Sequence, residues 1–150
     1  MFYVIQNGSL LKADNKQALT QYYDNVQILP TDYEEGKYIV QDNELVLNPD
    51  FEEEKAQKEK ARIAMLSLTR GDVFRGLLMA KQVTRTQIRA LIESNETLTM
   101  LEREMALIDF DEALNFYRGN PLIDTLGMTL GITSEQLDRF FETNDYTALI

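Results

Sequence analysis

Residues 1–48 have the short apolar runs of a small β-rich region. Two pairs of apolar runs are each separated by a two-residue turn signal, Asn7-Gly8 in the first pair and Asp42-Asn43 in the second. This is the pattern of a tight β-hairpin. A hairpin alone is marginal in water. We therefore expect the strands, with a further one at 26–29, to share one small sheet packed against a short helix at 15–23.

Residues 49–66 form a highly charged segment that predicts a helix between two modules. Asn48 is a capping residue, Pro49 suits the first helical position, and four acidic residues follow where the helix dipole favours them. Apart from Phe51 and Ala56, apolar residues begin only at Ala61, so the first turns are mostly polar. We place the domain boundary here, between a β-rich head of residues 1–48 and a helical part of residues 67–150.

From residue 67 onward, apolar positions recur at helical spacing. Three threonines follow an apolar residue and precede a hydrogen-bonding residue at the third position and an apolar one at the fourth. This is a capping box with a hydrophobic staple, although Asp72 is shorter than the preferred partner in the first case. The threonines are Thr69, Thr84 and Thr133. The sequence thus predicts an α+β protein whose C-terminal part is a compact bundle of about six short helices.

Six apolar stripes predict the core of this bundle, because helices this short are stable only when one face is buried. The stripes are Val73, Phe74, Leu77 and Leu78; Ile88, Leu91 and Ile92; Leu98, Leu101, Met105 and Ile108; Phe110, Leu114 and Tyr117; Leu122, Ile123, Leu126 and Leu130; and Leu137, Phe140 and Phe141. We interpret each stripe as core packing rather than as a binding site.

The composition excludes the commonest enzyme sites. Without cysteine there is no thiol nucleophile, and without histidine the usual general base and zinc ligand are missing. No glycine-rich phosphate loop is present. The densest carboxylate cluster, residues 109–112, could hold Mg²⁺ or Ca²⁺, but acidic residues at a helix start explain it more simply. We predict that the protein is not an enzyme and uses no cofactor and no metal.

The charges are unevenly distributed along a chain with 25 acidic and 15 basic residues. Residues 61–92 contain six basic residues and one acid, whereas residues 93–150 contain three basic residues and twelve acids. The predicted basic helices within residues 61–92 could bind DNA phosphates, or they could pack beside acidic helices of the same chain. A net charge of -10 repels a polyanion, so nucleic-acid binding is not expected.

Six residues form our candidate contact surface. Four arginines would make a polar face on the basic helices, and a Tyr-Arg pair at a predicted helix–helix corner could anchor a partner. Alternatively, the tyrosine completes the core and its neighbouring arginine contacts the last carbonyls of the preceding helix. The residues are Arg70, Arg75, Arg85, Arg89, Tyr117 and Arg118.

Parts of the chain resemble small proteins encoded by bacteriophages and prophages of Gram-positive-type bacteria, often among tail and tail-fibre genes. The resemblance lies in residues 38–49 and 51–59, and later in residues 117–124 and 131–138. Such proteins combine a short β-rich head, a charged helix and a helical C-terminal part. The resemblance implies a phage origin and no catalytic residues.

On this resemblance we expect a non-enzymatic structural or tail-assembly protein that acts through protein–protein contacts with tail components, with a homo-oligomer in keeping with assembly. Two alternatives stay open. One is an acidic inhibitor of a host defence protein, of the anti-CRISPR kind, and the other is a small DNA-binding regulator. From the apolar pattern we expect neither a signal peptide nor a membrane span. We expect synthesis in the host cytoplasm and, for a tail component, incorporation into the virion.

Overall fold

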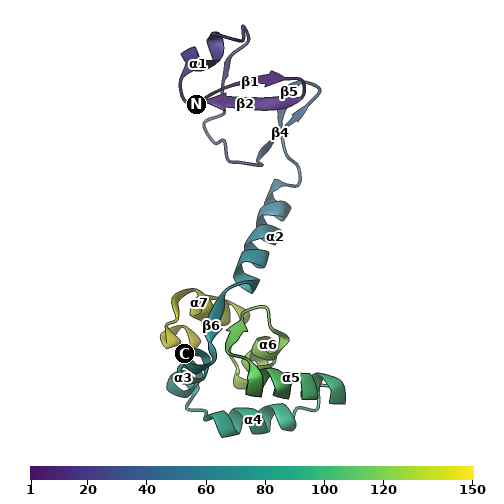
Figure 1. Cartoon of the computed structure of the whole chain (residues 1–150), viewed down its shortest axis with the longest axis vertical. Helices are drawn as coiled ribbons and strands as arrows, with labels where there is room; N and C mark the ends of the chain where they lie inside the picture. The colour runs from purple at the N-terminus through teal and green to yellow at the C-terminus, as the bar shows by residue number, and fades with distance from the viewer. The chain divides into compact units, whose positions relative to one another are not determined.

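The computed structural model describes all 150 residues, which divide into two compact units (Figure 1). Unit 1 is Met1–Ala56 and unit 2 is Gln57–Ile150, and the division falls inside the charged helix α2 (Phe51–Ala64). Small antiparallel sheets followed by seven α-helices confirm the α+β class. None of the helices has both the length and the apolar character needed to cross a lipid bilayer.

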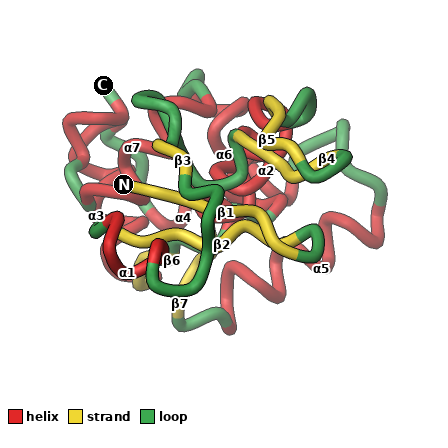
Figure 2. Tube along the Cα trace, turned by 90° about the horizontal axis from the view of Figure 1, so that it is seen from above, coloured by secondary structure: helices red, strands yellow, loops and turns green.

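Unit 1 contains two separate antiparallel sheets and one short helix. Strand β1 lies between β2 and β3, while β4 and β5 pair only with each other (Figure 2). The elements are β1 (Phe2–Gln6), β2 (Ser9–Ala13), α1 (Lys16–Thr20), β3 (Gln27–Ile28), β4 (Tyr38–Gln41) and β5 (Glu44–Leu47).

Both predicted hairpins are confirmed. The turn residues Asn7, Gly8, Asp42 and Asn43 all have positive φ, between 51° and 75°, which matches the twist of the flanking strands. The expectation of one shared sheet is wrong. Strand β1 is paired on both edges, and the outer strand β3 is only two residues long, so it offers almost no edge to β4.

A loop with three carboxylates is tied to the rest of unit 1 by ion pairs. Glu35 pairs with Lys12 of β2 at 2.5 Å, Asp32 with Lys37 at 2.5 Å and Glu34 with Lys55 of α2 at 2.8 Å. The hydrogen bond from Lys37 to Asp32, and next that from Tyr38, lowers the pKa of the Asp32 carboxyl. The bond from Lys12 lowers the pKa of Glu35 in the same way.

Unit 2 is a helical bundle with a small two-stranded ladder. It has five complete α-helices and a short 3₁₀ helix, η1, near the C-terminus, in agreement with the predicted bundle of about six short helices. Its elements are β6 (Ser67–Thr69), α3 (Arg70–Lys81), α4 (Arg85–Glu93), α5 (Met100–Glu112), β7 (Asn115–Tyr117), α6 (Pro121–Leu130), α7 (Ser134–Thr143) and η1 (Tyr146–Leu149).

Capping chemistry sets the starts of these helices largely as predicted. Thr84 and Thr133 form complete capping boxes with the glutamines three residues later. The Thr69 side chain accepts a hydrogen bond from the backbone N–H of Asp72. The short Asp72 side chain accepts a hydrogen bond from the Thr69 hydroxyl and does not reach the backbone N–H of Thr69. A third complete box, at Thr99, was not predicted, because Arg103 stands where the apolar staple residue is usual.

The predicted helical stripe of Phe110, Leu114 and Tyr117 is wrong. Helix α5 ends at Glu112, and the next residues form β7, which pairs with β6. Phe116 is buried between exposed neighbours, the period-two alternation of a strand. The partner strand lies far away in the sequence, so no local signal marks it.

Fifteen buried apolar side chains of unit 2 form one continuous core. Close helix contacts depend on small residues. At Gly76 of α3, an added Cβ would overlap the ring of Phe140 on α7, and at Gly127 it would lie 2.7 Å from Leu137. Glycine therefore lets α3 and α6 approach α7 closely.

Candidate interaction surface

Helix α5 leaves a predicted core stripe in solvent. Leu101, Met105 and Ile108 are 69%, 59% and 60% exposed. Their spacing of four and three residues places them on one line along the helix. Our expectation that this stripe belongs to the core is wrong, and the structure instead presents it as an apolar surface.

The opposite side of α5 explains this outcome. Phe110 and Ala106 are buried there, and Phe110 packs 5.0 Å from the ring of Phe74. Phe110 lies in the same helix as Leu101 and Met105 but points to the other side. Since a short helix on the edge of a bundle can bury only one face, the larger aromatic side chain occupies the core and the stripe stays outside.

Three of the candidate arginines converge on Asp111 at the C-terminal end of α5. Arg89 of α4 pairs with its carboxylate at 2.5 Å and Arg85 at 3.5 Å, while Arg70 of α3 donates to its backbone oxygen at 2.5 Å. The hydrogen bond to Asp111, and next that to Glu93, raises the pKa of Arg89. The arginines thus join three helices of unit 2.

Two of these arginines have further partners, and Arg75 lies apart from them. The Arg85 guanidinium also lies 5.8 Å from the ring centre of Phe74 and 5.3 Å from that of Phe110, a cation–π arrangement. Arg89 bonds Glu93 on its own helix at 3.0 Å. Arg75 pairs with Asp72 at 3.0 Å within α3. Each of the four predicted contact arginines therefore has an acidic or carbonyl partner inside the chain.

The Tyr117-Arg118 pair lies in and just after a strand, not at a helix–helix corner. Tyr117 is exposed and does not complete the core. Arg118 is only 6% exposed and donates to Asp138 at 2.6 Å, to Asp124 at 2.7 Å and to the Ser134 hydroxyl at 2.7 Å. It therefore fastens α6 and α7 together, and the predicted bond to the last carbonyls of the preceding helix is wrong.

The carboxylates of residues 109–112 lie in the last turn of α5, so the expectation that they stand at a helix start is wrong, and two of them take part in internal contacts. Asp109 accepts a hydrogen bond from the Asn120 side chain at 2.9 Å, and Asp111 binds the arginines. No group of three or more acidic side chains in the structure is arranged to hold a metal ion. Sequence reasoning missed Asp111 as the centre of the arginine cluster, because its partners come from two other helices.

Comparison of the chain with protein-family models, with curated protein sequences and with solved structures gives no match.

Proposed function

We propose that the chain is a non-enzymatic bacteriophage protein that acts through protein–protein contacts, as a structural or accessory component of tail assembly. The exposed stripe of Leu101, Met105 and Ile108 carries this proposal. Apolar side chains gathered on one exposed face, unlike single exposed ones, are typical of an interaction site. The tail assignment rests on the resemblance of residues 38–59 and 117–138 to phage proteins encoded near tail genes.

The arrangement of the arginines supports a protein partner over DNA. A DNA-binding helix pair would direct free basic side chains at phosphates. Here Arg70, Arg85 and Arg89 are held by Asp111, which favours the alternative of basic helices packed beside an acidic one.

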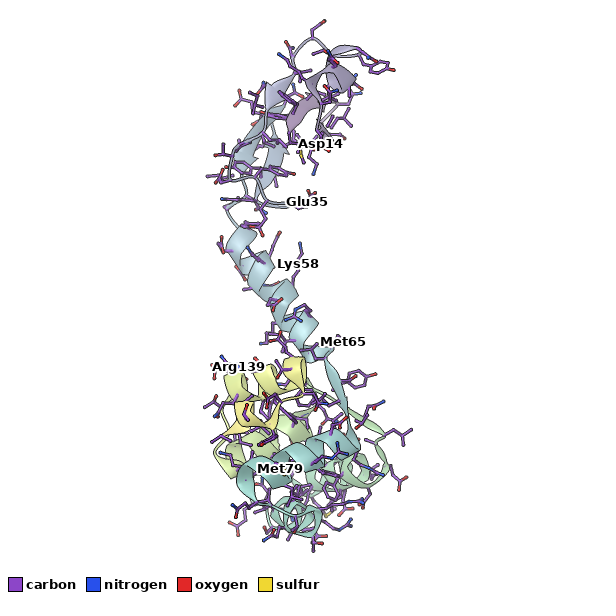
Figure 3. The ribbon with its side chains drawn as sticks, turned by 90° about the vertical axis from the view of Figure 1, so that its left-hand side faces the viewer. Asp14, Glu35, Lys58, Met65, Met79 and Arg139 are labelled. Atoms are coloured by element: carbon purple, nitrogen blue, oxygen red, sulfur yellow. The ribbon has the colours of Figure 1, made fainter.

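Affinity capture during phage replication tests the proposal. The tagged wild-type chain is compared with a triple variant, Leu101→Ser, Met105→Ser and Ile108→Ser, in cells in which the parent phage replicates. We expect mass spectrometry to find tail proteins in near-stoichiometric amounts with the wild type and not with the variant. Met79→Ser on α3, where Met79 is 56% exposed, is the matched control (Figure 3). Absence of any partner would contradict the contact role.

The acidic inhibitor is the second candidate, and the charge of unit 1 favours it. Unit 1 has eleven acidic and four basic residues. Recovery of one basic host protein, by the wild type and the triple variant alike and with steep loss at high salt, would support this candidate instead.

A further inference from the structure

The stripe on α5 is bordered by carboxylates that have no cation of their own. Glu104 lies beside the line of Leu101, Met105 and Ile108, and Glu112 continues that line by one turn. Both side chains are exposed, and neither forms an ion pair within the chain. The C-terminal end of the helix adds the partial negative charge of its carbonyls. The surface is therefore apolar in the middle and negative at its edge and end.

No basic side chain of α5 offsets this charge. Arg103, the one basic residue of the helix, turns toward the preceding loop and donates to the carbonyl oxygens of Asn95 at 2.8 Å and Leu98 at 3.4 Å. Arg85 and Arg89 of α4 pair with Asp111, which lies seven residues after Glu104 and therefore on the same side of α5, and Arg89 also pairs with Glu93. The charge of both arginines is thus compensated within the chain.

We infer that this face of α5 binds an amphipathic helix of a partner protein whose apolar side is flanked by lysine or arginine. The inference rests on the proposed contact function and names the chemistry of the partner. The spacing of Leu101, Met105 and Ile108 offers about two turns of apolar contact, the usual geometry of helix-to-helix recognition. The flexible thioether of Met105 suits such a surface, because it adapts to the side chains packed against it.

Charge disfavours a second copy of the chain as the occupant. Two α5 helices packed through their stripes would bring Glu104 and Glu112 of both copies together, with no exposed basic residue of α5 between them. Like charges at such a contact oppose association.

The test uses the full-length protein and a fluorescent synthetic helix with a leucine face flanked by lysines. A control peptide keeps the leucine face and replaces every lysine with glutamate. We expect anisotropy titrations to show binding of the lysine peptide alone. Met105→Glu should weaken it by roughly tenfold or more, as for a central contact residue, while Met79→Glu should change it less than about twofold, as expected away from the contact.

A second pair of variants tests the charged border. The double variant Glu104→Gln, Glu112→Gln should bind the lysine peptide severalfold more weakly at low salt. Its binding should also depend less on salt, because the attraction between these carboxylates and the lysines, which salt screens, is lost. Circular dichroism of each variant checks that the helices remain folded.

Three results would overturn the inference. They are equal binding of both peptides, unchanged binding by Met105→Glu, and a dimer of the wild type in light scattering that Met105→Glu dissolves. Failure of the proposed function is a separate result: capture would then find no partner, whatever the peptides do. If capture depends on the stripe while the peptides are bound equally, only the chemistry assigned to the partner is wrong.

Discussion

Unit 1 buries five apolar side chains, whereas unit 2 buries fifteen in one continuous core. Unit 1 instead depends on two hairpin turns and on exposed ion pairs around its loop of carboxylates. Exposed ion pairs contribute little to stability and weaken in salt. The stability of unit 2, which comes from its apolar core, should therefore change little with salt and pH, whereas that of unit 1 should respond to both.

The largest expected effect comes from opening the core of unit 2. Phe140→Ala removes a buried ring and should cost about 3–5 kcal/mol of unfolding free energy. Urea denaturation measures the loss, and hydrogen exchange resolved by residue should show lower protection in unit 2 only. Loss of protection across β1 and β2 as well would show that the two units unfold together and would break the comparison.

A smaller loss follows from filling the close contact between α3 and α7. Gly76→Ala places a methyl group against the ring of Phe140. Overpacking of this kind lowers the free energy of unfolding by about 1–3 kcal/mol. The higher helix propensity of alanine offsets up to about 1 kcal/mol of this loss. Gly71→Ala is the matched control in the same helix, because its Cβ would meet nothing closer than 3.8 Å. Equal effects of the two changes in urea denaturation would contradict the contact.

Capping gives the next effect. Thr99→Ala removes the hydroxyl that accepts from the backbone of Glu102 and should cost about 1 kcal/mol. Thr86→Ala, inside α4, removes a threonine that caps nothing and should be neutral or slightly stabilising. Thermal unfolding of the two variants compares them directly, and a loss at Thr86 as large as that at Thr99 would argue against the cap.

The smallest effect is the acid response of unit 1. The pKa values of Asp32 and Glu35 are lowered in the folded state, from ordinary values of 3.8 and 4.5. The stability that these two carboxylates contribute is therefore fully present above their ordinary pKa values. It is lost as the pH falls below about 4.5 and passes through the lowered pKa values of the folded state. Hydrogen exchange of β2 at pH 5 and pH 3.5 measures it. Lys12→Met should reduce the difference, and an unchanged difference would show that the Lys12–Glu35 pair contributes nothing.

The turns and helix caps that were predicted correctly from the sequence are each determined by residues close together in the chain. The Asn7-Gly8 and Asp42-Asn43 turns need only their own backbone geometry. The caps at Thr84 and Thr133 each close within three residues. Such chemistry is complete within a few positions, so a single sequence is enough to identify it.

The errors arose where the deciding contact is distant in sequence. Whether α5 buries Leu101 or Phe110 is decided by α3, which supplies Phe74. Apolar spacing reports both faces of such a helix and cannot choose between them. The candidate arginines were located correctly on α3 and α4, but their common partner Asp111 could not be foreseen. The exposed stripe emerged only once the position of α5 in the bundle was known.

The ladder between β6 and β7 has a consequence for the order of events during folding. Its register joins Leu68 to Phe116 and so encloses all of α3, α4 and α5 in one loop. Closing a loop costs more entropy the longer it is, whereas the hairpin around Asn7-Gly8 closes almost no loop and forms within about 1–10 μs. Unit 1 can therefore start from its turns at once. In unit 2 we expect the ladder to form after the helices it encloses have packed together, so that its hydrogen bonds would be among the last to form.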